Sequence, residues 1–310
     1  MSNERGQLFT RRSFMQTAAA GVPIGLIGVR LKPSESLEKL FAEIRNNLLQ
    51  MINEERDLEK LPPVALDDLA NRVATRHAQD MATAEFASHW GSDGLKPYQR
   101  YSFAGGSEAT HENVSAADNT WSMKPEDLKL DTSYLHVRLY QEKPPNDGHR
   151  QAILAPQQTH VGIGFAVEKL RLRMVELFLA RYVEVKSIKR QASLKDKIQF
   201  NGKLLHPSHI LNSLEVFYEP LPKPPDIEWL RQPRSYSLPT ESKRLMPVLP
   251  SPYLYLDRTR GVIEVNTSGS FSTPIPLFKN SPGIYTLVCW IKRTPGEKSF
   301  PGTQLSIRVE

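Results

Sequence analysis

The sequence predicts an α+β chain of two domains, an α/β/α layered domain of about 150 residues followed by an all-β sandwich of about 110 residues. Three observations indicate this. Apolar residues recur at helical spacing only in the part before Lys186. Two alternating apolar runs, residues 160–167 and 173–185, close that part as a strand pair. Beyond Lys186 lie 15 of the 24 prolines, among short apolar runs that suit strands and turns.

Length and composition agree with this division. A chain of 310 residues corresponds to about two domains, and 39% hydrophobic with 24% charged residues is typical of a globular protein. The net charge is +6, of which residues 1–31 supply +3 (four Arg, one Glu) and the remainder +3 (6 − 3). No dense basic stripe with interleaved aromatics is present, which argues against nucleic-acid binding.

Residues 1–32 are expected to be an export signal and not part of a domain. Arg11 and Arg12 precede Ser-Phe-Met, and a weakly apolar run follows from about residue 17 to 29. This arrangement is typical of a twin-arginine signal, which a receptor reads as an address. The alternative is a basic tail before a short amphipathic helix. A clear cleavage site is missing, so an uncleaved signal that tethers the protein stays open. We expect a bacterial protein, periplasmic or extracellular.

The first domain is predicted to occupy residues 37–185. A helix opens near residue 34 and is broken by Pro62-Pro63, and a second amphipathic helix covers residues 65–84. His77 lies on the apolar face of that second helix and is expected to pack there. Residues 86–106 are predicted as a glycine-dotted loop, residues 110–116 as a short strand and residues 133–143 as a third helix. A sharp Pro-Pro corner then separates Glu142 from His149, followed by the strand pair.

The second domain is predicted to cover residues 198–310, after a polar, basic linker at 186–197. Its short strands and Pro/Gly turns favour a β-sandwich, possibly immunoglobulin-like. Tyr285, near the start of a central strand, is a candidate for a corner hydrogen bond of the immunoglobulin kind. Cys289, the single cysteine, excludes an intrachain disulfide and is expected to be a small buried hydrophobe.

Four polar residues of the first domain form a candidate site: His89, Glu112, Glu142 and His149. Neutral imidazoles are good transition-metal ligands, and a carboxylate can fix an imidazole tautomer or act as a base. Spacing alone makes this a weak signal. The run HENVS is not a zincin motif, because position 115 is serine.

The order of four motifs carries a family resemblance. The stretch from Asn53 to Ala82, then SHWGSDGLKPYQR, HENVS and NDGHRQAILAPQQTHVGIGFAV resemble the CAP superfamily of cysteine-rich secretory, antigen 5 and pathogenesis-related 1 proteins, in its bacterial SCP-like branch. The resemblance covers roughly residues 37–185. It implies a three-layer α-β-α sandwich whose cleft holds two histidines and two glutamates.

Carried over residue by residue, the resemblance assigns His89 and His149 as the two histidines and Glu112 as the first glutamate. Glu142 is the weakest transfer, since bacterial members vary just before the Gly-His motif. His160, at the entry of a strand, is expected to be a packed or capping residue. His111, next to Glu112, is expected to point to the opposite face if its segment is extended.

The leading functional hypothesis is an exported, non-catalytic binding module. Its cleft would hold a ligand (lipid, peptide or glycan) or a divalent metal such as zinc on His89 and His149, and the β-domain would attach it to a partner, glycan or envelope surface. One alternative is a zinc-dependent hydrolase with Glu112 or Glu142 as general base, although two protein ligands is one short of the usual three. Another is a structural envelope protein with a vestigial cleft. Oligomeric state is left open.

Overall fold

The computed structural model describes residues 35–118 and 124–310, so the predicted signal at 1–32 lies outside the described residues. The first domain contains, in chain order, α1 (Glu35–Leu58), β1 (Ala65–Leu66), α2 (Asp68–Ala84), α3 (Pro97–Phe103), β2 (Ala109–Asp118), α4 (Pro125–Tyr140), α5 (Gly148–Ile153), β3 (His160–Glu168) and β4 (Arg171–Ala180). The predicted helices and the strand pair are confirmed, and the strand predicted at 110–116 is part of β2.

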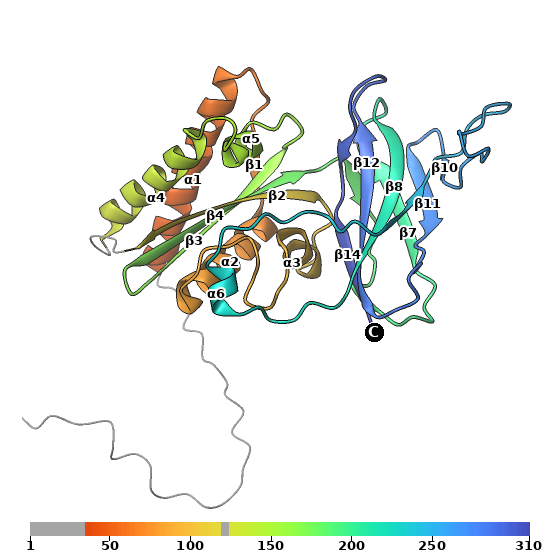
Figure 1. Cartoon of the computed structure of the whole chain (residues 1–310). Coiled ribbons are helices and arrows are strands. Elements are labelled where there is room, and N and C mark those ends of the chain that lie inside the picture. The colour runs from red at the N-terminus through yellow and green to blue at the C-terminus, as the bar shows by residue number, and fades with distance from the viewer. Residues whose placement is uncertain (1–34, 119–123) are drawn as a thin grey trace, which may run out of the picture.

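These elements form three layers, as predicted. The central sheet has the order β1-β3-β4-β2, which leaves β2 at one edge. Figure 1 shows α1, α4 and α5 on one face of this sheet and α2 with α3 on the other. Each face has its own apolar core. One includes Ile44 and Leu135 against Phe178, and the other includes Val73 and Met81 against Leu177.

Two glycines of β3 allow α2 to lie directly on the sheet. A Cβ added at Gly164 would lie 2.1 Å from the backbone carbon of Ala74, and one at Gly162 would lie 2.2 Å from that of Ala70. Backbone cannot yield as a side chain can, so these glycines set the spacing between α2 and β3.

We expect Gly164→Ala to lower the free energy of unfolding by about 1–3 kcal/mol or more, because the added methyl group overlaps the α2 backbone. Urea denaturation followed by circular dichroism measures this. Gly148→Ala is the matched control, because a Cβ there would meet nothing within 4 Å. Equal stability of the two variants would contradict close packing of α2 on β3.

The glycine-dotted segment 86–106 was predicted as a loop, and this is wrong for its second half. It contains α3, which begins at Pro97, where a fixed φ and a missing N–H cost nothing. The Gln99 side chain accepts a hydrogen bond from the Lys96 amide at 2.9 Å and caps the helix. A helix of seven residues is too short for its apolar spacing to stand out.

The first two strands of the second domain's sheets lie in segments that were predicted to be the end of the first domain and the linker. Its elements are β5 (Val183–Val185), β6 (Gln191–Ala192), β7 (Gln199–Leu204), β8 (Ile210–Glu219), α6 (Ile227–Leu230), β9 (Ser242–Leu245), β10 (Glu264–Val265), β11 (Ser270–Pro274), β12 (Gly283–Lys292), β13 (Phe300–Pro301) and β14 (Leu305–Val309). β5 pairs with β7, and β6, inside the predicted linker, pairs in parallel with β14. The chain therefore enters the second domain's sheets from residue 183 onward.

Two sheets form the predicted sandwich, with orders β10-β11-β7-β5 and β6-β14-β12-β8-β9. Phe200 and Phe271 from the first sheet pack against Leu214 and Leu287 from the second. The corner hydrogen bond predicted for Tyr285 is confirmed, since its hydroxyl donates to the Ser281 carbonyl at 3.0 Å. Cys289 is free and fully buried, also as predicted.

The domains meet through paired polar groups and a shared apolar cluster. The Ser306 amide donates to Ser102 Oγ at 2.7 Å, and the Thr110 amide donates to Gln304 Oε1 at 2.8 Å. Tyr182, directly after β4, packs into the sandwich core. We expect the two domains to unfold together because of this continuous contact.

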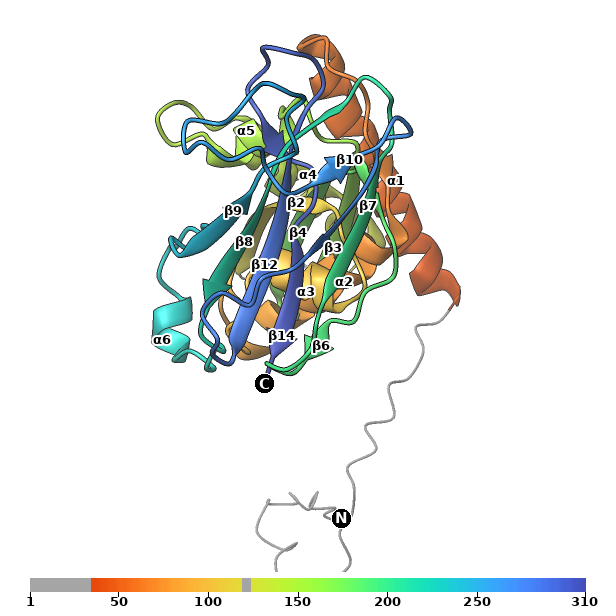
Figure 2. The same cartoon turned by 90° about the vertical axis from the view of Figure 1, so that its right-hand side faces the viewer.

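One segment of the second domain departs from an all-β structure. Residues 220–241, between β8 and β9, carry α6 and are called the strap here. Figure 1 shows the strap leaving the second domain, placing α6 beside α2, and returning across the first domain. Figure 2 shows α6 set apart from the strands that precede and follow it in sequence.

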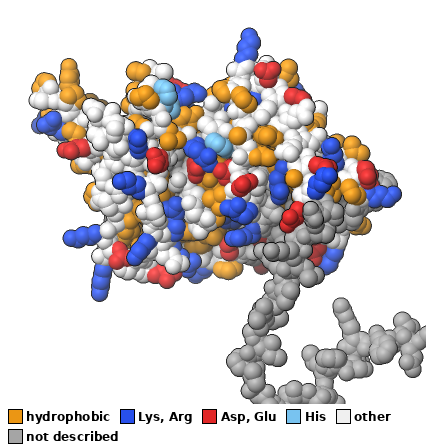
Figure 3. All heavy atoms as spheres, turned by 180° about the vertical axis from the view of Figure 1, so that it is seen from behind, with side chains coloured by type: hydrophobic (Ala, Val, Ile, Leu, Met, Phe, Trp, Pro, Cys, Tyr) orange, Lys and Arg blue, Asp and Glu red, His pale blue; other side chains and the backbone are white. Residues whose placement is uncertain are grey.

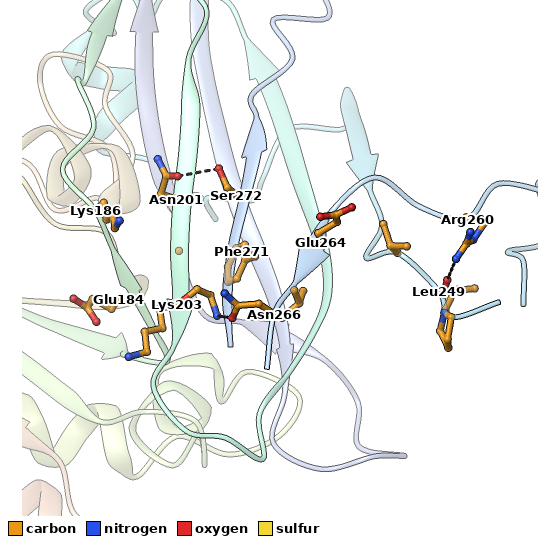
Figure 4. Close-up of a pocket in the computed structure, with 15 residues that line it drawn as sticks. Glu184, Lys186, Asn201, Lys203, Leu249, Arg260, Glu264, Asn266, Phe271 and Ser272 are labelled. Carbon is orange, nitrogen blue, oxygen red and sulfur yellow. Dashed lines mark hydrogen bonds between the residues drawn. The ribbon is translucent and has the colours of Figure 1, made fainter. Parts of the chain in front are cut away.

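A broad hollow of about 900 Å³ lies on the outer side of the sheet β10-β11-β7-β5. Figure 4 shows its mixed lining, with Lys203 and Glu184 on one side and Asn201 hydrogen-bonded to Ser272 on another. The hollow is open to solvent, and both polar and apolar side chains line it. Within residues 35–118 and 124–310, no helix has both the length and the apolar character needed to traverse a bilayer.

Candidate functional site

The candidate site is a pocket of about 600 Å³ at the free edge of β2. All four residues singled out in the sequence line this pocket, and so do residues of the strap. Its lining consists of His89, Thr110, His111, Glu112, Asn113, Glu142, Asn146, Gly148, His149, Ser235 and Tyr236.

His89 and Glu112 form the first of two His–Glu pairs. His89 lies in the loop after α2, and its Nδ1 is 3.1 Å from Glu112 Oε1. Arg100, on α3, donates from Nη2 to Glu112 Oε2 at 2.7 Å and from Nη1 to the His89 carbonyl at 2.8 Å. Arg100 therefore orients both members of the pair.

The charge state of Glu112 follows from its neighbours. Burial opposes its ionisation, but the positive charge of Arg100, the electrostatic effect of His77 and the hydrogen bond with His89 outweigh burial and hold the pKa of Glu112 at about 2. An ionised carboxylate only accepts hydrogen bonds. The proton of neutral His89 therefore sits on Nδ1, and its Nε2 carries a free lone pair.

Glu142 and His149 form the second pair across the Pro-Pro corner. His149 Nδ1 is 2.5 Å from Glu142 Oε1, and the His149 amide donates to Oε2 at 3.0 Å. One carboxylate thus holds both the ring and the backbone of His149. This explains why a rigid corner joins the two residues, because the corner returns the chain so that α5 begins against Glu142.

The two pairs lie on opposite faces of the sheet and meet around its edge. Side chains alternate along a strand, and Glu112 is opposite Leu177, which belongs to the core beneath α2. His149 lies on α5, in the layer on the other face, and its carbonyl accepts from Asn113 Nδ2 at 3.1 Å. The His89 and His149 ring centroids are 6.3 Å apart.

Strand alternation predicts that His111 points to the opposite face of β2 from Glu112. His111 follows the strand alternation, yet it lines the same pocket. Burial first, and then the proximity of His89 and His149, lower its pKa to about 4, so His111 adds a neutral imidazole to the pocket. The physical reason is the edge position of β2, because an edge strand lets the pocket reach both faces of the sheet.

Sequence reasoning missed two residues that shape the site, Arg100 and Tyr236. Tyr236 comes from the strap, and its ring centroid is 4.7 Å from that of His89. Its hydroxyl accepts a hydrogen bond from the Glu112 amide at 2.6 Å. Burial and the negative charge of Glu112 raise the pKa of Tyr236, so it stays protonated at neutral pH. The only sequence signal is an aromatic residue in the short run between Pro233 and Pro239.

The pocket has features that suit a divalent cation. Each of His89 and His149 has its Nδ1 held by a carboxylate, the usual arrangement behind metal-binding imidazoles. Two imidazoles on one tetrahedral zinc ion have ring centroids roughly 5–5.5 Å apart, given Zn–N bonds of about 2.1 Å. The two rings here are 6.3 Å apart, so they would have to move closer together to share a zinc ion. In the part of the chain that the structure describes, no three His, Cys, Asp or Glu side chains converge as a metal cluster. A cation here would have two imidazole ligands from the protein.

A second His–Glu cluster lies buried in the α1/α4 layer, below the pocket. His136 Nδ1 is 2.6 Å from Glu176 Oε1, and its Nε2 is 3.0 Å from Glu55 Oε2. Burial disfavours a charged imidazole, but the two carboxylates outweigh this and raise the pKa of His136 to about 10. Asn113 donates to Glu176 Oε2 at 3.1 Å as well as to the His149 carbonyl. Asn113 therefore links this cluster to the pocket.

The two histidines expected to be structural lie outside the pocket lining. His77 is buried on α2, with Nε2 2.8 Å from the Ser88 carbonyl. His160 begins β3, with Nδ1 2.9 Å from Thr159 Oγ1 and Nε2 3.1 Å from Arg181. Both expectations are confirmed, since each ring packs or bonds locally.

Comparison with known proteins finds a family match within the first domain. Residues 49–176 match the cysteine-rich secretory protein family, also called CAP. A curated relative, the uncharacterized protein YkwD of Bacillus subtilis strain 168, is 25% identical over 119 residues, or 38% of this chain. The match spans 40% of that relative's length, so the likeness concerns one domain of each protein.

Solved structures are similar over less than half of this chain. An extracellular protein of Bacillus anthracis that contains an SCP domain is 21% identical with a TM-score of 0.33, covering 44% of this chain and 40% of its own. An outer surface protein of Borrelia burgdorferi is 19% identical with a TM-score of 0.36, covering 45% of this chain and 93% of its own.

Proposed function

Because residues 49–176 of this chain form a CAP domain, we propose that the protein is an exported, non-catalytic binding module whose cleft holds a ligand between the two His–Glu pairs. A divalent cation such as zinc is the simplest ligand, held by His89 and His149. One observation carries the proposal. Both imidazoles have Nδ1 anchored on a carboxylate, so each offers Nε2 to the same pocket.

The state of the carboxylates favours binding over hydrolysis. A general base works best when its pKa is near the operating pH, and the pKa of Glu112 is about 2. Its other oxygen is already bonded to Arg100. Both oxygens of Glu142 are bonded to His149. Neither carboxylate is therefore arranged to take a proton from a metal-bound water, which weakens the hydrolase alternative.

Export and surface attachment complete the proposal. The paired arginines and the apolar run near the N-terminus support export to the periplasm or the cell exterior. The open hollow on the second domain, with its mixed polar and apolar lining, is a suitable surface for an envelope component, glycan or protein partner. Acidic and basic side chains are intermixed on the face seen in Figure 3, which suits such partners better than nucleic acid.

Cobalt titration tests the cation part of the proposal, because Co²⁺ substitutes for zinc and gives visible absorption bands. We expect about one Co²⁺ per chain in the wild type. The double variant His89→Ala/His149→Ala is expected to lose this binding by at least about 100-fold, because both protein ligands are gone. Equilibrium dialysis with metal analysis gives the stoichiometry.

The matched control is His206→Ala/His209→Ala. These histidines also lie close together, with ring centroids 5.1 Å apart, but in a turn of the second domain. This control variant should bind Co²⁺ like the wild type. If the control loses binding while His89→Ala/His149→Ala keeps it, the cation does not occupy the cleft and this part of the proposal is wrong.

A further inference from the structure

The strap docks on the first domain through a strong anchor at α6. Leu230 is 1% exposed and belongs to the core cluster beneath α2. The Trp229 ring meets Trp90 edge to face, with centroids 5.4 Å apart. Nearer β8, the strap backbone lies close to Gly94. A Cβ added at Gly94 would be 2.6 Å from the carbonyl oxygen of Lys223. The first part of the strap is therefore fixed.

Beyond α6 the contacts change in kind. The Ser235 carbonyl accepts from Trp90 Nε1 at 3.4 Å, and the Ser237 carbonyl accepts from Lys96 Nζ at 3.2 Å. Between them, Tyr236 enters the pocket against His89. Side chains of the groove thus hold alternate main-chain carbonyls while the intervening side chain fills a pocket. Proteins recognise extended peptides in this way.

Tyr236 is held by a backbone amide that does not take part in the pairing of β2 with β4. The Glu112 amide points away from β4 at the sheet edge and donates to the Tyr236 hydroxyl. An edge strand offers such amides to any acceptor that lies beside it. Around Tyr236, the strap is exposed at residues 231–235 and at Ser237. Little apolar area therefore holds this part in place, apart from the one ring.

We propose that the groove between Trp90, Lys96 and the edge of β2 binds an extended peptide with an aromatic side chain, and that Arg234–Ser237 of the strap are its resident intramolecular occupant. This rests on the proposed function, because it assigns a ligand class to the same cleft. A tethered segment competes at a roughly millimolar effective concentration. An external peptide therefore binds fully only when the strap segment lifts away.

The test uses the whole chain and a labelled free peptide, RQPRSYSLPT, which corresponds to residues 231–240. The variant Ser235→Gly/Tyr236→Gly vacates the pocket while α6 and β9 keep the strap ends in place. By fluorescence anisotropy, we expect this variant to bind the peptide saturably and at least about tenfold more tightly than the wild type. The same peptide with alanine at the Tyr236 position should lose at least about tenfold in affinity.

Tyr253→Gly is the matched control, because Tyr253 is an exposed tyrosine of the second domain, and this variant should behave like the wild type. Tyr236→Ser is a milder second variant, used if the double variant melts well below the wild type.

The inference is overturned if the wild type and the two variants that remove the Tyr236 ring bind the peptide equally. It is also overturned if neither of these two variants binds the peptide. Cobalt binding in the same samples separates the two proposals. Retained cobalt without peptide binding defeats only the peptide groove, whereas peptide binding without cobalt defeats only the cation site.

Discussion

Replacing Arg100 by alanine is expected to lower the free energy of unfolding by about 3–5 kcal/mol at neutral pH. The side chain of Glu112 is only 2% exposed, and Arg100 is its ion-pair partner at 2.7 Å. Without the guanidinium, a buried carboxylate is left with His89 as its remaining side-chain partner. The Leu95 and His89 carbonyls also lose a charged donor at 2.7 and 2.8 Å. Urea denaturation at pH 7 measures this loss.

The pH dependence gives a second readout of the same pair. The folded pKa of Glu112, about 2, lies below its ordinary value of 4.5. A depressed carboxyl pKa stabilises the fold above pH 4.5, and this contribution is lost as the pH falls toward 2. The wild type should therefore lose more stability than Arg100→Ala between pH 4.5 and pH 2. Arg100→Lys should be intermediate, since it keeps the charge but not the forked donor geometry.

Arg231→Ala is the control for the Arg100 series. Arg231 pairs with Glu228, which is 72% exposed, and exposed pairs contribute about 0–1 kcal/mol. If Arg100→Ala costs no more than Arg231→Ala, then Arg100 does not neutralise Glu112. Co²⁺ titration of Arg100→Ala is expected to show weaker binding as well, because the same side chain orients the His89 backbone.

Replacing His136 by leucine is expected to cost about 3–5 kcal/mol, because it leaves the carboxylates of Glu55 and Glu176 without their shared cation. The Glu176 side chain is fully buried and that of Glu55 is 12% exposed. Replacing all three by leucine should recover most of the lost stability, since burying an apolar triad leaves no charge unpaired. Thermal and urea unfolding of the two variants test both statements.

This cluster also predicts alkaline sensitivity. The pKa of His136 is raised to about 10 from an ordinary value of 6.5. Its contribution is therefore complete below pH 6.5 and is lost as the pH rises through 10. Relative to His136→Leu, the wild type should become progressively less stable across that window. His206→Leu, an exposed histidine, should follow the wild type at every pH. A constant difference between wild type and His136→Leu across this range would contradict a charged His136.

Local sequence patterns predicted the main helices and the strand pair of the first domain. The apolar residues of α1 and α2 repeat at helical spacing, and the β3–β4 pair alternates around a short turn, so each element carries its own signal. The corner at Pro144-Pro145 placed Glu142 and His149 on either side of a sharp turn, but the turn alone was also compatible with an ordinary helix–helix corner. These features depend on residues within a few positions of one another.

Other features had no comparable signal. α3 and α6 are too short for periodicity to appear. His136 reads as one more polar residue in an amphipathic helix until α4 is packed against α1 and β4. His111 was assigned by strand alternation alone, which holds within a strand but does not say that the strand lies at an edge.

By itself, the sequence determined the two-domain order, the layered first domain and the sandwich, because short-range spacing encodes each of these. Only the tertiary structure decided that Arg100 neutralises Glu112, that His111 joins the pocket and that Tyr236 enters it from the other domain. Tyr236 and Glu112 are 124 positions apart. Contacts at such separations depend on the sum of many packing interactions, and neither residue carries a local pattern that names its partner.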